Sequence, residues 1–236
     1  AYEIRPRDWS SDVCSSDLGG LMADNPATID DAANAATVVL LCGDLKEELP
    51  VLHLRLRGSA EKKRTRIIEF APKQTGLTPY AWKHVGFEPG TQAASVEATL
   101  ANAAVAAQLA KGPVVIVVGK ANLAESGAAQ MAAFAALRAA APNAKVLTAN
   151  RRGNVAGALR MGMRTGANGL DTRFILKAAA EGKIECLVLV GADPLADCPD
   201  TDLARRGLAG ARRIIAVDTF LTASSQKADV VFAASA

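Results

Sequence analysis

The stretch ECLVLVGADPLADCPD, residues Glu185 to Asp200, decides the fold class of this chain. It begins with an unbroken apolar run, Cys186 to Val190, and such a run is typical of a strand buried on both faces in a parallel sheet. The run ends at Gly191. A residue without a Cβ allows the chain to turn sharply there. Pro199 then opens a predicted helix, TDLARRGL. Strand, glycine turn and helix form the unit of nucleotide-binding α/β sheets, and also of many sheets that bind nothing.

The same order of elements recurs along the whole chain. The predicted strands lie at 37–42, 65–70, 114–118, 145–149, 186–190, 213–217 and 229–232. The main predicted helices between them lie at 50–60, 92–110, 125–141, 171–181 and 201–208. This alternation favours parallel βαβ units with right-handed crossovers. We therefore expect an α/β fold of Rossmann-like parallel sheets with helices on both faces, in two lobes at 19–110 and 111–236.

Two parts of the chain resemble each other. The first part, near the start, consists of the strand and turn VVLLCG, a helix and the strand RIIEF. The second part consists of the strand and turn LVLVGADP, a helix and the strand RIIAVD. The distance from the glycine to the paired isoleucines is nearly the same in both parts. The pattern predicts an internal duplication of a strand, turn, helix and strand, because its period is too long for a solenoid repeat.

Residues 1–18 are expected to lie outside the fold. Their sequence, AYEIRPRDWSSDVCSSDL, has no apolar periodicity and no signal-peptide layout. Asp8 to Leu18 resembles the translation of a sequencing-library adapter. The segment is therefore interpreted as an artefact that packs against nothing specific, with native sequence missing upstream of it.

Composition limits the classes of function. The 236 residues are 50% apolar and 4% aromatic, with a formal net charge of +3. Dispersed basic residues and few aromatics argue against a nucleic-acid surface. No apolar run reaches the roughly 18–20 residues of a membrane helix. Cys42, Cys186 and Cys198 show no C-x-x-C spacing, so no iron–sulfur or zinc site is predicted.

Four residues are candidates for ligand binding because they follow predicted strands, at the edge where α/β sheets bind ligands. They are Arg152, Asn154, Gly191 and Asp218. A guanidinium suits a phosphate and a carboxylate suits a ribose hydroxyl. The alternatives are a solvated basic loop with Asn154 as a helix cap, a tight turn at Gly191 and a loop cap at Asp218. His53 and His84 are interpreted as structural, and no residue is assigned to catalysis or to a metal.

Four motifs resemble those of the molybdopterin oxidoreductases. RRGNVAGALRMG (151–162) is similar to their RG-x-NN-V-x-G segment, and LVGADPLADCPD (189–200) to their G-x-N-P turn. VDTFLTASSQKADVVFAAS (217–235) is similar to their D-x-F-x-T-x-T-x-x-ADVVLPA segment, and FEPGT (87–91) to R-P-G-T-D. The resemblance covers nearly all of 28–236 and, with VVLLCGDLKEELPVLHLRLR, is greatest to the G subunits of bacterial NADH-quinone oxidoreductase, complex I. It implies part of the formate dehydrogenase/DMSO reductase fold, domains 1–3.

The resemblance to the G subunits implies a scaffold without a molybdenum cofactor. The parent protein would take part in electron transfer from NADH to quinone, through iron–sulfur clusters in an N-terminal part. Its partners would be other subunits of the peripheral arm, on the cytoplasmic face of the inner membrane, without nucleic acid or direct membrane insertion.

The alternative is the cofactor-binding middle part of a catalytic molybdopterin oxidoreductase, such as a formate dehydrogenase alpha subunit. Arg152, Asn154, Gly191 and Asp218 would then contact molybdopterin guanine dinucleotide. Three departures from the family pattern argue against it: Asp193 in place of asparagine, a single asparagine at Asn154, and Arg160 in place of an acid.

Overall fold

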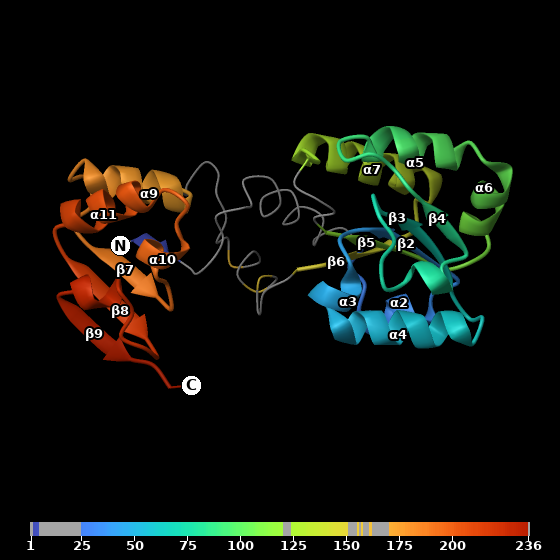
Figure 1. The fold of residues 1–236 in the computed structure, drawn as a ribbon. Coiled ribbons are helices and arrows are strands. Elements are labelled where there is room, and N and C mark those ends of the chain that lie inside the picture. Colours follow the sequence, from blue (N-terminus) through green and yellow to red (C-terminus); the bar gives the residue numbers. More distant parts are fainter. Residues whose placement is uncertain are drawn as a thin grey trace. The chain divides into compact units, whose positions relative to one another are not determined.

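The structure, a computed structural model, describes residues 2–4, 25–119, 124–150, 155, 157, 161 and 170–235. The chain divides into two units. One spans 13–163 and holds a five-stranded sheet, and the other combines 1–12 with 164–236 and holds a four-stranded sheet. We call them the five-stranded unit and the four-stranded unit (Figure 1).

The five-stranded sheet is parallel throughout, with the order β4-β3-β2-β5-β6. Its strands are β2 (Thr37–Leu41), β3 (Arg66–Phe70), β4 (Lys83–Val85), β5 (Val114–Val118) and β6 (Lys145–Thr148). Every residue of β2 and β5 is buried, as the unbroken apolar runs predict for central strands of a parallel sheet. The predicted strand positions are confirmed to within about one residue, and so is the α/β class.

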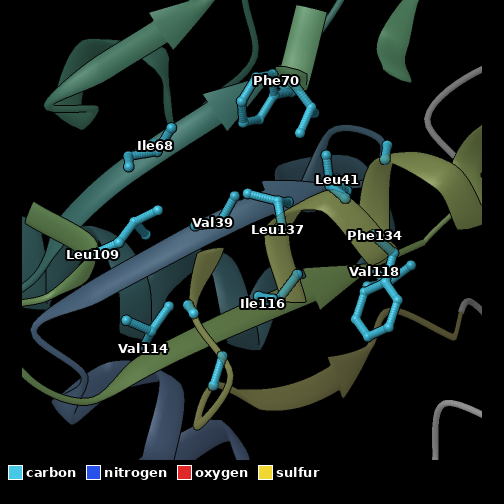
Figure 2. Close-up of a cluster of buried hydrophobic side chains, with 14 of the residues drawn as sticks. Val39, Leu41, Ile68, Phe70, Leu109, Val114, Ile116, Val118, Phe134 and Leu137 are labelled. Atoms are coloured by element: carbon cyan, nitrogen blue, oxygen red, sulfur yellow. The ribbon is translucent and has the colours of Figure 1, made fainter. Parts of the chain in front are cut away.

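Helices cover both faces of this sheet (Figure 1). One face packs against α5 (Gln92–Leu100), α6 (Ala103–Leu109) and α7 (Gly127–Ala140). The other face packs against α2 (Ile29–Asn34), α3 (Leu45–Glu48) and α4 (Pro50–Glu61). Figure 2 shows the first core, where Leu41 and Phe70 of the sheet lie with Leu137 of α7. A large apolar side chain buried in this way contributes about 1.5–3 kcal/mol.

Two features of this unit differ from the predicted elements. The helix expected over 92–110 is two helices, because Asn102 leaves the helical conformation and its side chain caps α6 through the amides of Ala104 and Val105. The irregular stretch expected at 76–90 contains a short helix, η1 (Thr78–Tyr80), and strand β4. A three-residue edge strand carries too little apolar pattern to be seen in the sequence.

The four-stranded sheet has the order β1-β7-β8-β9 and is also parallel. Its strands are β1 (Tyr2–Ile4), β7 (Leu187–Val190), β8 (Ile214–Asp218) and β9 (Val230–Ala233). The helices of the unit are α9 (Thr172–Ala180), α10 (Pro194–Asp197), α11 (Thr201–Gly210) and the short η2 (Ser225–Lys227). Its core joins Leu176, Leu187 and Leu208 with similar residues of α9, α11 and the sheet.

The expectation that residues 1–18 pack against nothing was wrong for Tyr2–Ile4. Their backbone pairs in parallel with β7, in the register Tyr2↔Leu187 to Ile4↔Leu189. The physical reason is that β7 has β8 on only one side, and an unpaired strand edge is a template for any extended segment. The rest of that segment, 5–18, lies outside the described residues.

The division of the chain also differs from the predicted lobes, 19–110 and 111–236. β5 pairs with β2 along its whole length, and β6 pairs with β5, so both belong to the five-stranded sheet. Strands that pair across distant parts of the chain leave no mark in the order of elements, which is why the sequence pattern missed this. Within the described residues, no helix is both long and apolar enough to cross a membrane.

Candidate functional site

The carboxyl ends of the parallel strands define the candidate site in each sheet. In the five-stranded sheet, the strand order reverses between β2 and β5, and a crevice at such a point is where open α/β sheets bind ligands. β2 leads into Gly43 and β5 leads into Gly119. The side chains around these two glycines therefore decide what this edge can bind.

A carboxylate fills the space beside Gly43. A Cβ placed on Gly43 would overlap Oε1 of Glu48, which lies at the end of α3. The glycine therefore allows a close approach, but the approaching group is the protein's own side chain. Gly119 is enclosed in a similar way, because a Cβ there would lie 2.8 Å from Cβ of Ala149 and 3.1 Å from Cβ of Cys42.

The end of β2 is acidic. Burial raises the pKa of the Cys42 thiol, and the negative charges of Glu48, Glu69 and Asp44 raise it further. A raised pKa favours the protonated thiol, which suits Cys42 to pack as a small apolar side chain.

A second carboxylate accepts a hydrogen bond from a backbone amide just before α5. Oε1 of Glu125, a buried residue just before α7, accepts a hydrogen bond of 2.6 Å from the Gly90 amide. Gly90 belongs to the FEPGT turn that leads into α5. An amide beside a helix N-terminus is a natural partner for a phosphate, and here an internal carboxylate takes it.

A third carboxylate holds the loop between β3 and β4. Glu69 lies on β3 with 2% of its surface exposed. It accepts hydrogen bonds from the hydroxyls of Thr75 and Thr78, the latter at 2.6 Å, and lies 2.9 Å from Nδ1 of His84. His84, on β4, is thus held by a buried carboxylate of the neighbouring strand.

The four-stranded sheet brings together two of the four predicted residues. Gly191 follows β7 and Asp218 ends β8, and these are neighbouring parallel strands, so both residues lie at one edge. Gly191 has a φ of +54°, which favours glycine, and a Cβ there would meet nothing within 4 Å. Oδ1 of Asp218 accepts a hydrogen bond of 3.4 Å from the Phe220 amide, the loop cap that was one of the alternatives. Arg152 and Asn154 lie outside the described residues, as does Arg160.

Asp193 has a structural partner that the sequence did not reveal. Its Oδ1 accepts hydrogen bonds from the amide of Ser224, at 3.2 Å, and from the hydroxyl of the same residue, which is fully buried. The Ser224 hydroxyl in turn accepts from the Leu195 amide at 3.0 Å. Asp193 therefore ties the turn after β7 to the loop after β8.

The five-stranded unit repeats this arrangement. Asp44 follows the glycine turn after β2, and its carboxylate accepts from the Gly76 amide at 3.1 and 3.2 Å, in the loop after β3. In both units a short 3-10 helix and a further parallel strand come next along the chain. The matching bonds support the predicted duplication. An aspartate one or two residues after each glycine was the signal in the sequence that could have found them.

The described residues of the five-stranded edge do not fit a molybdopterin dinucleotide. Such a group carries a pyrophosphate, which needs open amides or guanidinium groups. The positions beside Gly43 and on the Gly90 amide hold the carboxylates of Glu48 and Glu125 instead. At the four-stranded edge, Gly191 leaves open space, although the carboxylates of Asp193 and Asp218 lie at the same edge. In the described parts of both units, no three His, Cys, Asp or Glu residues cluster as a metal site requires.

Comparisons with solved structures agree with the fold. Acetylene hydratase from Pelobacter acetylenicus aligns with a TM-score of 0.59 and 13% identity, over 92% of this chain and 43% of that one. A chain of the formyltransferase/hydrolase complex from Methylorubrum extorquens aligns with a TM-score of 0.56 and 15% identity, over 94% of this chain and 70% of that one. At this level of identity the similarity concerns the fold alone.

Comparisons with curated proteins agree with the resemblance in the motifs. The G subunits of NADH-quinone oxidoreductase from Mycobacterium bovis and Mycobacterium tuberculosis are each 30% identical over 225 aligned residues. The alignment covers 84% of this chain and 28% of the relative, so the chain spans only part of the length of these proteins. A G-type subunit of the same enzyme from Rhizobium meliloti is 38% identical over 66 residues, 28% of this chain and 8% of that protein.

A model of the molybdopterin oxidoreductase family matches residues 4–236, nearly the whole chain. The chain belongs to the molybdopterin oxidoreductase family.

Proposed function

We propose that this chain is part of a G-type subunit of NADH-quinone oxidoreductase and serves there as a scaffold domain that binds no molybdopterin dinucleotide. The similarity to the G subunits supports the assignment to this enzyme. One observation supports the absence of the cofactor: carboxylates of the chain itself lie where the five-stranded edge would have to accept phosphates.

The electrostatic argument rests on Glu48 and Glu125. Two unit charges of the same sign at contact distance repel by about 1–4 kcal/mol, depending on how far solvent screens them. Glu125 holds a backbone amide at 2.6 Å, so a phosphate would have to displace an existing charge-assisted hydrogen bond as well. Glu48 fills the space beside Gly43 that a ligand would need. These effects add, and both oppose an anionic ligand.

The role of the parent protein follows from the same proposal. It takes part in electron transfer from NADH to quinone, through iron–sulfur clusters held by other parts of the polypeptide. Its partners are the other subunits of the peripheral arm, and its place is the cytoplasmic face of the inner membrane. The present chain contributes shape and contact surface to that arm, and no catalytic residue.

A catalytic molybdopterin oxidoreductase is the second candidate. The observation that favours it is the four-stranded edge, where Gly191 leaves open space next to the strand that ends at Asp218. A carboxylate there would accept a hydrogen bond from a ribose hydroxyl, and the glycine would let a phosphate approach the backbone. The observation against it is Asp193, whose carboxylate keeps its negative charge while it accepts hydrogen bonds from Ser224 and would repel a nearby phosphate.

Metal analysis of the native assembly decides between the two. The parent protein, tagged at its chromosomal gene, is purified with its partners from cells grown with ample molybdate, and its iron and molybdenum contents are measured. We expect several iron atoms and negligible molybdenum per chain, with no guanine nucleotide released on denaturation. A molybdoenzyme purified from the same cells is the control for cofactor supply. About one molybdenum per chain would overturn the scaffold proposal and establish the catalytic one.

A further inference from the structure

Helix α9 has apolar side chains on two opposite faces. Ile175, Leu176 and Ala179 are buried against the sheet and α11, as an amphipathic helix requires. Phe174, however, is 55% exposed, and Leu170, just before the helix, is 45% exposed. Leu170 precedes the helix, but both side chains line one pocket beside Lys177, and together they form an apolar surface that no described element covers.

This apolar surface borders a groove between α9 and α11. The groove has a volume of about 440 Å³, and its lining includes Arg173, Phe174, Lys177, Asp200, Leu203 and Arg206. The two helices approach closely because α11 has glycines at the contact, Gly207 against Leu176 and Gly210 against Ala179. The groove lies wholly within the four-stranded unit.

The acidic side chains in the groove already have partners within the chain, whereas two of the basic side chains form no ion pair among the described residues. The two acidic residues are engaged, Asp200 with the Leu203 amide at 2.9 Å and Glu181 with Lys183 at 2.7 Å. Arg206 pairs with Asp202 at 3.1 Å on the exposed side of α11. Within the described part of the chain, no carboxylate forms an ion pair with Arg173 or Lys177. The groove therefore presents two cations beside an exposed aromatic ring.

We propose that the groove between α9 and α11 is a docking site for an acidic amphipathic segment of a partner protein. The partner would place carboxylates against Arg173 and Lys177 and an apolar side chain against Phe174. This combination matches the common mode in which an amphipathic helix lies in an apolar groove and charges at its rim set the partner. The inference does not depend on whether either sheet edge holds a cofactor.

The shape and charge of the groove favour a peptide over other anionic partners. A membrane surface engages protruding basic and aromatic side chains, whereas this surface is concave. Nucleic acid presents a dense row of phosphates, and the carboxylates of Glu181 and Asp200 inside the groove would repel part of that row. An acidic helix can place neutral residues opposite those two carboxylates.

The test uses the whole chain and a fluorescent helical peptide with Glu on one face and Leu on the other. We expect saturable binding that weakens with added salt. The double variant R173E/K177E should bind at least about tenfold more weakly, and F174A should also lose affinity. The matched control for the single variant R173E is R205E, which makes the same change of charge on an exposed residue of α11 outside the groove and should bind like the wild type, whereas R173E should bind more weakly.

A charge swap makes the test specific. A peptide in which Lys replaces every Glu should bind R173E/K177E better than it binds the wild-type chain. Melting temperatures of all variants are compared first, and they should agree because the altered side chains are exposed. No binding of the acidic peptide, equal binding by R173E/K177E, or stronger competition from anionic vesicles or single-stranded DNA would each overturn the proposal.

Discussion

Asp193 shows at the scale of one residue how position in the fold changes the meaning of a side chain. In the sequence it is a carboxylate where related enzymes have asparagine, which suggested repulsion of a phosphate. In the structure it accepts two hydrogen bonds from Ser224. An asparagine can accept the same bonds through its side-chain oxygen, so these bonds do not by themselves require the negative charge of Asp193.

A mutation series at Asp193 tests this structural role. Asp193→Asn should change the free energy of unfolding little. Asp193→Ala should lower it by about 1–3 kcal/mol, because the buried Ser224 would lose its partner. Chemical denaturation of both variants, of Ser224→Ala and of the double variant Asp193→Ala/Ser224→Ala measures the coupling. Strictly additive effects would show that the two residues do not act as a pair.

The surroundings of His53 predict how the stability of the chain depends on pH. It is buried on α4, and its Nδ1 has no hydrogen-bond partner among the described residues. Burial lowers its pKa below the ordinary value, despite the opposing effect of Asp44. The unfolded chain therefore takes up the proton more readily than the folded chain. The contribution of neutral His53 to the free energy of unfolding is fully present above about pH 6.5, the pKa in the unfolded chain, and is lost as the pH falls below it.

The variant His53→Gln should remove this part of the pH dependence. Melting temperatures are measured between about pH 8 and pH 5, the range around the ordinary histidine pKa. We expect the wild-type value to fall more steeply with acidification than the variant's. Parallel curves would mean that His53 is protonated equally in the folded and unfolded chain.

At the scale of elements, three glycines of the helices differ in what surrounds them. A Cβ at Gly207 would lie 2.9 Å from Cδ2 of Leu176 and 3.0 Å from its carbonyl oxygen. A Cβ at Gly210 would overlap the carbonyl oxygen of Ala179. Gly58, inside α4, has nothing within 4 Å. The first two therefore set the spacing of α9 and α11, whereas Gly58 has no packing role.

Alanine substitutions at these glycines should have opposite effects. Gly58→Ala should stabilise the chain by about 0.5–1 kcal/mol, because alanine loses less backbone freedom in a helix. Gly207→Ala and Gly210→Ala should destabilise it by about 1–3 kcal/mol, because the helices must move apart. Thermal unfolding of the three variants checks this, and the helix contact would be shown to be adaptable if all three were stabilised.

At the scale of the whole molecule, β1 decides whether the first residues belong to the fold. The Leu187 amide donates a hydrogen bond to the carbonyl oxygen of Arg213, just before β8. Because successive amides of a strand point to opposite sides, the Val188 amide points toward β1. We expect that deletion of residues 1–18 speeds hydrogen exchange at the Val188 amide. The free energy of unfolding should change by less than about 1 kcal/mol, because the few bonds of a short edge strand barely exceed its ordering entropy.

The control for this deletion is the exchange rate in β5, which lies in the other unit and should not change. Unchanged exchange at Val188 would contradict the β1–β7 pairing. A larger loss of stability would show that the first eighteen residues are an integral part of the four-stranded unit.

The helices and strands of this protein can be predicted from the chain alone, because their signals are local. Apolar runs such as TVVLL and LVLV predicted the parallel strands, and Gly43 and Gly191 marked where each run turns. The sequence also placed Gly191 and Asp218 at strand ends, and neighbouring parallel strands bring them to one edge.

The pairing of strands into sheets and the contacts between distant side chains became known from the three-dimensional structure. β5 joins β2 although a whole α/β segment separates them, so the predicted boundary at residue 110 does not divide the two sheets. The carboxylate of Glu125 accepts a hydrogen bond from the Gly90 amide, 35 residues away. The carboxylate of Asp193 accepts one from Ser224, 31 residues away. Such contacts depend on the closing of long loops around a packed core, and no local pattern in the chain records their outcome.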